Sequence, residues 1–166
     1  ALVLDGQTLV GVTYDPTRKE MFAAVRNEGA LLNGEPIMVS KKNRLADSVL
    51  GTDISYSHEG AVTGLSLVSS IWPNMQTVRI MGSAALGIAY VAAGRTDLYF
   101  HHGLEPWDQV AGILLVEEAG GVITDRMGAR AGLYSDGLAA SNATLHAEFM
   151  RKTEGTLWRN PARCLA

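Results

Sequence analysis

Two long apolar helical segments limit the folds open to this chain more than any other feature. Residues 83–93 and 106–119 carry apolar side chains around almost their whole circumference, and glycines at 94 and 120 end them. A helix of this kind has no face for solvent, so it must be buried between other layers. The sequence therefore predicts more than two layers, with helices on both faces of a sheet.

The remaining elements divide the chain into two parts and a tail. Turn signals between apolar runs predict antiparallel strands in residues 1–40. These signals are Asp5-Gly6, Asp15-Pro16 and Asn33-Gly34. In residues 41–152, short apolar runs alternate with helical segments, a pattern typical of an α/β layer. Residues 153–166 show no clear pattern, and we expect them to fray. The predicted fold class is α/β, or α+β over the whole chain.

Composition limits the classes of partner that we expect. The chain has 14 basic and 17 acidic residues and a net charge of −3, so it offers no basic surface for nucleic acid or anionic lipid. No apolar run reaches the roughly 18 residues that span a bilayer. With one cysteine, Cys164, an internal disulfide is impossible, and no signal peptide is visible. We therefore expect a cytoplasmic protein without nucleic-acid or membrane partners.

Asp108 is the first candidate for chemistry. Pro106 suits the start of a helix, which places Asp108 in the first turn, where the helix dipole favours the ionised carboxylate. A carboxylate beside free backbone N–H groups suits a hard cation together with an anionic substrate. The alternative is that Asp108 only caps its helix.

Gly82, Ser83 and Ala84 form the second candidate. Their small side chains would let a ligand approach a helix start, where the Ser83 hydroxyl and backbone N–H groups could bind its oxygens. The alternative is tight helix packing, or an N-cap by Ser83. Asp53 and Ser55 follow a predicted strand and could border the same pocket, since α/β sheets bind ligands at strand C-termini.

Other polar residues are expected to be structural. His101 and His102 are neighbours on a strand and point to opposite faces, so they do not chelate one ion easily. Glu117 and Glu118 lie at the far end of their helix from Asp108, where salt bridges are the expected role. His146 resembles a solvated helix residue.

Several ordered motifs together resemble one family. They are Trp107-Asp108-x-x-Ala111-Gly112, Glu118-Ala119-Gly120-Gly121, Gly82-Ser83-Ala84-Ala85, Gly94-Arg95-Thr96-Asp97-Leu98-Tyr99, Ala139-Ala140-Ser141-Asn142 and the Asn33-Gly34 turn. From about residue 2 to residue 150, the chain resembles the C-terminal portion of proteins of the inositol monophosphatase family. The members of this family are Mg²⁺-dependent sugar-phosphate phosphatases. The resemblance implies a layered α-β-α-β-α sandwich, and a dimer is expected.

The resemblance also implies roles for single residues. Asp108 stands where the family has a ligand of a catalytic Mg²⁺, and Gly82, Ser83 and Ala84 stand where it contacts the sugar or inositol ring. His101 occupies the position of a Glu that binds an inositol hydroxyl, a departure that leaves the ring specificity open. Inositol monophosphate, fructose 1,6-bisphosphate, histidinol phosphate and 3′-phosphoadenosine phosphates all remain candidate substrates.

Two metal-binding segments of the family, Gly-Glu and Asp-Pro-x-Asp-Gly-Thr, do not occur in this sequence. The chain opens on Ala1 within apolar strand material, so we expect a fold whose N-terminal part is missing. The parent protein is then a phosphatase of a small phosphorylated polyol or sugar, and the isolated chain is inactive. The alternative is a non-catalytic binding or assembly module that keeps the phosphatase fold.

Overall fold

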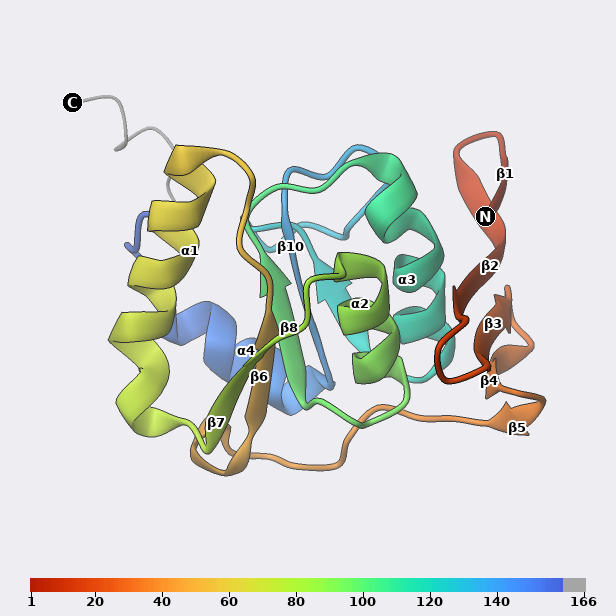
Figure 1. Ribbon diagram of the computed structural model, residues 1–166, viewed down its shortest axis with the longest axis horizontal. Coiled ribbons are helices and arrows are strands. Elements are labelled where there is room, and N and C mark those ends of the chain that lie inside the picture. The colour runs from red at the N-terminus through yellow and green to blue at the C-terminus, as the bar shows by residue number, and fades with distance from the viewer. Residues whose placement is uncertain (160–166) are drawn as a thin grey trace.

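A computed structural model describes residues 1–159 of the chain, which form two five-stranded sheets and four α-helices (Figure 1). The first sheet is an antiparallel meander in sequence order. Its strands are β1 (Leu2–Leu4), β2 (Gln7–Asp15), β3 (Glu20–Val25), β4 (Gly29–Leu32) and β5 (Glu35–Pro36). Asp5 and Asn33, in two of the predicted turns, take positive φ angles of 48° and 50°, which Asp and Asn tolerate better than most residues.

The second sheet is mixed and has the order β7-β6-β8-β10-β9. Its strands are β6 (Val49–Thr52), β7 (Thr77–Ile80), β8 (Leu98–His101), β9 (Val122–Thr124) and β10 (Leu138–Ser141). β6 runs parallel to β7 and β8, whereas β10 is antiparallel to β8 and β9. The C-terminal ends of β6, β7 and β8 therefore meet at one edge of the sheet.

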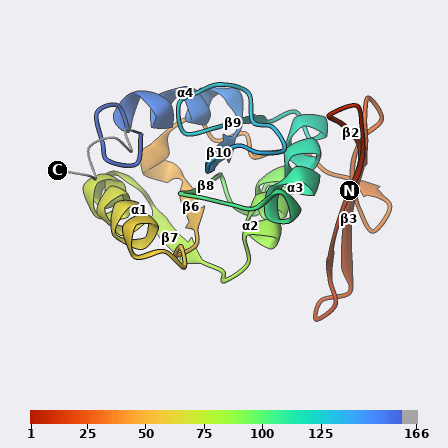
Figure 2. The same cartoon turned by 90° about the horizontal axis from the view of Figure 1, so that it is seen from above.

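Four helices cover this second sheet in two layers. They are α1 (His58–Ile71), α2 (Ala84–Ala92), α3 (Pro106–Glu118) and α4 (Ala143–Lys152). α1 and α4 pack on one face, and α2 and α3 lie between the other face and the meander, as Figure 2 shows from above. Because both sides of α2 and α3 meet a sheet, their nearly continuous apolar surface is buried, as the sequence predicts. The described layers run sheet, helices, sheet, helices.

Glycines allow the layers around α3 to approach closely. A Cβ on Gly11 of β2 would lie 2.7 Å from the carbonyl oxygen of Ala111, so the meander packs directly on the α3 backbone. A Cβ on Gly112 would lie 2.6 Å from the Ile88 side chain of α2. Both distances are shorter than a carbon contact allows, so these two positions require glycine at the present helix spacing.

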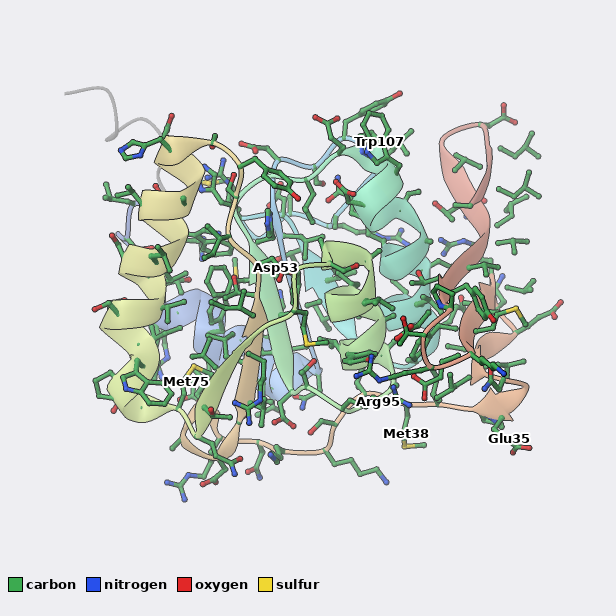
Figure 3. The ribbon with its side chains drawn as sticks, in the orientation of Figure 1. Glu35, Met38, Asp53, Met75, Arg95 and Trp107 are labelled. Atoms are coloured by element: carbon green, nitrogen blue, oxygen red, sulfur yellow. The ribbon has the colours of Figure 1, made fainter. Side chains whose placement is uncertain are left out.

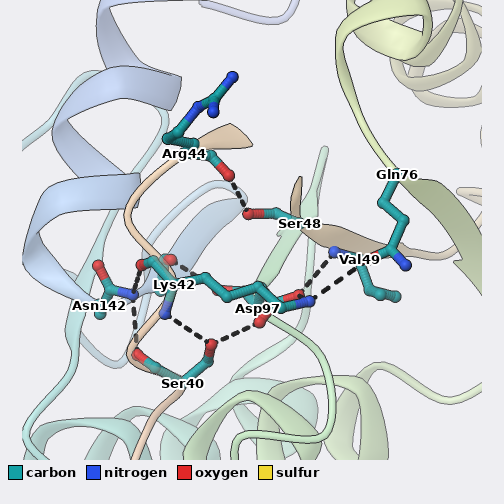
Figure 4. Close-up of polar contacts among 9 residues, drawn as sticks. Ser40, Lys42, Arg44, Ser48, Val49, Gln76, Asp97 and Asn142 are labelled. Carbon is teal, nitrogen blue, oxygen red and sulfur yellow. Dashed lines mark hydrogen bonds and ion pairs between the residues drawn. The ribbon is translucent and has the colours of Figure 1, made fainter. Parts of the chain in front are cut away.

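A buried carboxylate ties the connection between the sheets to the second sheet (Figure 4). Asp97, 4% exposed, accepts hydrogen bonds from Ser40 Oγ (2.5 Å), Lys42 Nζ (3.0 Å) and the backbone N–H of Val49 (2.6 Å). Asn142, the N-cap of α4, donates from Nδ2 to the carbonyl oxygens of Ser40 and Lys42, both at 2.8 Å. Because this charge is buried with several partners, it fixes the path of the connecting segment.

The face of the meander that points away from α3 is apolar. Its exposed side chains are Leu2, Val12, Tyr14, Met21, Val25 and Leu31, and these six residues are called the outer face below. An antiparallel sheet with one face in water usually alternates apolar and polar side chains. Here the six side chains that point away from α3 are all apolar. An apolar outer face of this kind is typical of a surface that another layer covers.

Two sequence-based expectations were wrong. Residues 153–159 do not fray, because Thr153 and Trp158 are fully buried and Trp158 packs edge-on against the rings of Phe100 and Phe149. His146 is not solvated but 8% exposed, with Nε2 3.0 Å from Thr124 Oγ1. In both cases the partners lie far away in the sequence, where local periodicity gives no signal. The remaining tail residues, 160–166, lie outside the described part, and Cys164 with them.

Across residues 1–159, none of the helices combines the length and the apolarity that a membrane span requires.

Candidate functional site

A cavity of about 740 Å³ opens at the edge where β6, β7 and β8 end. The N-termini of α2 and α3 form its other wall. It brings together all five residues that the sequence singles out as site candidates, and Asp53 and Ser55 as well. These five are Gly82, Ser83, Ala84, His101 and Asp108. Ligands of α/β sheets bind at such carboxyl ends.

The start of α2 presents small residues to the cavity. Gly82 has a φ of +77°, a conformation that L side chains rarely adopt, and it turns the chain from β7 into the helix. Ser83 is the N-cap, and its Oγ accepts the N–H of Leu86 at 3.4 Å. Ser83 therefore caps its helix and also lines the cavity. The first N–H groups of a helix have no partner within it, so this end suits a ligand that carries oxygens.

Asp108 lies in the first turn of α3, half-buried at the cavity wall. Its Oδ2 accepts the backbone N–H of Glu105 at 3.1 Å, so the carboxylate caps the helix. Its Oδ1 makes no hydrogen bond to the described residues. Figure 3 shows Trp107 at the outer end of α3, where its side chain is 77% exposed. Asp108 can thus cap the helix with one oxygen and offer the other to a ligand.

His101 ends β8 and is buried, 6% exposed. Its Nδ1 accepts the N–H of Gly103 at 3.2 Å. Burial lowers the pKa of His101 below its usual value, although the nearby carboxylates of Asp53 and Asp108 oppose that shift. At neutral pH the imidazole is therefore uncharged, and because Nδ1 is an acceptor, Nε2 carries the proton and can donate to a hydroxyl oxygen. His102 points elsewhere, with Nδ1 3.2 Å from Arg126, so the two histidines do not share a ligand.

Asp53 has a role in the site that the sequence only hinted at. Figure 3 shows Asp53 between β6 and α2, and its carboxylate accepts hydrogen bonds from Tyr99 Oη and from the N–H groups of Met81 and Gly82. Tyr99 belongs to one of the family motifs in the sequence, but it was given no role in the site, because a tyrosine in an apolar strand carries no sign of its partner.

Among the described residues, four carboxylates line the cavity and are candidate ligands for Mg²⁺. Besides Asp108 they are Asp53, which accepts from three donors, Glu105, which shares the capping box of α3, and Asp136, which is paired with Arg126. Within residues 1–159 no group of three or more His, Cys, Asp or Glu side chains could hold a metal ion. Mg²⁺ sites often use one or two carboxylates, with phosphate oxygens and waters completing the octahedron. Asp108 therefore fits one corner of such a site, and further ligands must come from elsewhere.

The far end of α3 is structural, as the sequence predicts. Glu117 pairs with Arg26 at 3.3 Å and with Arg130 at 2.8 Å. Glu118 accepts the backbone N–H groups of Asn27 and Gly29, at 2.9 and 3.0 Å. These contacts fasten a turn of the meander to α3, and neither glutamate lines the cavity.

Comparisons with known proteins agree with this architecture. The sequence model of the inositol monophosphatase family matches residues 1–157. The chain is 39% identical to "Nus factor SuhB" of Pasteurella multocida, over 95% of this chain and 59% of that protein. It is 36% identical to "Inositol monophosphatase 1" of Solanum lycopersicum, over 85% of this chain and 53% of that protein.

Among solved structures, an IMPase of Thermotoga maritima superposes with a TM-score of 0.83 at 35% identity, over 90% of this chain and 57% of that one. The protein suhB of Bartonella henselae gives the same TM-score at 36% identity, over 89% and 57%. The chain thus spans between half and three fifths of the length of these relatives. By sequence and by fold, it belongs to the inositol monophosphatase family.

Proposed function

We propose that this chain is the substrate-binding portion of a Mg²⁺-dependent phosphomonoesterase that hydrolyses a small phosphorylated polyol or sugar. The observation that carries the proposal is the cavity in which Asp108 faces the start of α2 and His101. A carboxylate with a free oxygen beside a helix N-terminus suits a cation and a phosphate group together. Membership in the inositol monophosphatase family supports the same reaction class.

Each residue has a definite task in this proposal. Asp108 Oδ1 would hold one Mg²⁺ ion, which, when bound, neutralises the phosphate and activates a water. The Ser83 hydroxyl and the backbone N–H groups of Ala84 and Ala85 would donate hydrogen bonds to the oxygens of the substrate, and Gly82 leaves room for it. The neutral imidazole of His101 would donate from Nε2 to the oxygen of a ring hydroxyl. A neutral His lacks the charge of a carboxylate, so the ring preference should differ from that of relatives with Glu in this place.

The isolated 166-residue chain is expected to be inactive, because Asp108 alone cannot hold the metal ions that the reaction needs. We expect the phosphatase to be cytoplasmic and to act as a homodimer. A longer protein that carries the remaining ligands would therefore be the active form.

Phosphate release from inositol 1-phosphate with Mg²⁺ tests the proposal. The longer protein should turn over, and Asp108→Asn should lower kcat by at least about a hundredfold, since the metal would lose a charged ligand. Asp47→Asn is the matched control, because Asp47 is an exposed carboxylate that pairs with Arg44 and does not line the cavity. Equal activity of the Asp108 and Asp47 variants would remove the assignment, and robust turnover by the 166-residue chain would overturn the expected inactivity.

The second candidate is a binding or assembly module. What favours it is the name "Nus factor SuhB" of relatives at 39–42% identity, which names no phosphatase activity. The prediction that this protein has no nucleic-acid partner therefore stays a prediction. A longer protein that shows no turnover with a panel of phosphate esters, yet keeps its fold, would favour this second candidate.

A further inference from the structure

One carboxylate organises the turn that leads into α2. Asp53 follows β6 directly, and its Oδ1 accepts the backbone N–H groups of Met81 (2.9 Å) and Gly82 (2.5 Å). Its Oδ2 accepts the hydroxyl of Tyr99 at 2.8 Å. The carboxylate therefore joins the ends of β6 and β7 to a side chain of β8.

The Tyr99 ring that holds Asp53 is itself fixed. Tyr99 is fully buried, and a Cβ on Gly51 or Gly87 would lie 3.0 Å or 2.3 Å from ring atoms, so backbone packs against it on two sides. Burial raises the pKa of Tyr99, and the negative charge of Asp53 raises it further. The phenol therefore stays protonated and donates to the carboxylate over the whole working pH range.

The hydrogen bonds of Asp53 decide which role it can play. Oδ1 accepts two backbone N–H groups and Oδ2 accepts the Tyr99 hydroxyl, so most of the acceptor capacity of Asp53 is used within the protein although it lines the cavity. Gly82 has a positive φ, and because glycine reaches many backbone conformations, contacts from other residues must select this one.

We propose that Asp53, anchored by Tyr99, is a positioning residue that holds the Gly82–Ser83 turn in the geometry that binds the phosphate ester. This rests on the function proposed above, in which the start of α2 receives the ester oxygens. Asp53 acts through the backbone of Met81 and Gly82 and not by touching the reacting atoms.

The test compares three variants and one matched control, all made in the 166-residue chain. Asp53→Ala removes all three hydrogen bonds. Asp53→Asn keeps an oxygen for the two N–H groups and places an amide where it can donate to Tyr99 Oη. Tyr99→Phe removes only the anchor. The control is Asp125→Ala, because Asp125 also follows a strand of the second sheet and accepts two backbone N–H groups on Oδ1, from residues 127 and 129, outside the cavity.

Two measurements are made on each variant, after thermal melting has established that it is folded. Amide hydrogen exchange by NMR reports on Gly82. In Asp53→Ala its exchange should accelerate by about tenfold, the loss expected when a backbone N–H loses its hydrogen-bond acceptor. Titration with inositol 1-phosphate and Mg²⁺ reports on binding, and Asp53→Ala should bind about tenfold more weakly. Asp53→Asn should restore both values to within a few-fold, Tyr99→Phe should fall between, and the control should change neither.

The outcomes separate this inference from the proposed function. Unchanged Gly82 exchange in Asp53→Ala overturns the inference, as does faster exchange with unaltered ester affinity. Failure of the Asn variant to restore either value overturns it too, because charge and not geometry would then be the cause. If no form, wild type included, binds the ester, the proposed function fails, and the exchange data alone decide whether Asp53 holds the turn.

Discussion

Replacing Trp158 by alanine should destabilise the chain strongly, although Trp158 lies near the C-terminus. Its side chain is fully buried, with ring centroids 5.6 Å from Phe100 and 5.5 Å from Phe149, both in edge-on geometry. Its Nε1–H donates to the carbonyl oxygen of His101 at 3.3 Å. The tryptophan therefore joins α4 to β8, close to the point where β8 enters the cavity.

The magnitude follows from these contacts. Truncation of a buried tryptophan to alanine costs about 3–5 kcal/mol, because the cavity left behind is only partly filled. A domain of this size has a total stability of about 5–15 kcal/mol, so the loss is a large share of it. At about 2–4 °C per kcal/mol, the melting temperature should fall by roughly 6–20 °C. Trp158→Phe keeps the aromatic packing and loses the Nε1–H bond, so about 1–2 kcal/mol is expected.

Urea unfolding followed by circular dichroism measures this loss. Trp107→Ala is the control, because that side chain is 77% exposed and its removal should cost no more than about 0.5 kcal/mol. A loss in Trp158→Ala within about 1 kcal/mol of the control would show that residues 153–159 do not contribute to the core, and the packing argument would be refuted.

Three further predictions follow from buried contacts and from the outer face. Gly112→Ala should cost about 1–3 kcal/mol in urea unfolding, because its Cβ would lie 2.6 Å from Ile88, whereas Gly64→Ala in α1 meets no atom within 4 Å and should be neutral or stabilising. Burial lowers the pKa of His146 below its unfolded value, so the contribution of this group to the free energy of unfolding should be fully present above about pH 6.5. It should be lost as the pH falls toward the folded pKa. A urea midpoint that does not change between about pH 7.5 and 5 would contradict this. His146→Gln should flatten that pH dependence. The outer face should bind a second copy of the chain, so sedimentation should show concentration-dependent association that Val12→Lys weakens; a wild-type chain that stays monomeric at all concentrations would argue against it.

The sequence by itself determined the elements and most of the candidate site. Turn dipeptides such as Asn33-Gly34 predicted the meander, and apolar helices at 83–93 and 106–119 predicted a layered fold, because both signals act over a few neighbouring residues. The ordered motifs around Ser83 and Asp108 predicted the family, and the structure brings both residues into one cavity.

Only the tertiary structure decided which isolated side chains are buried and what they contact. Trp158 was expected to fray, yet it packs beside the carbonyl of His101, 57 residues earlier in the chain. Asp53 and Tyr99 are 46 residues apart, and nothing in the sequence near either predicts their hydrogen bond. The physical reason is that burial of a single polar or aromatic group depends on what the folded layers place around it. Local patterns specify the layers, but the long-range contacts exist only after the layers have packed.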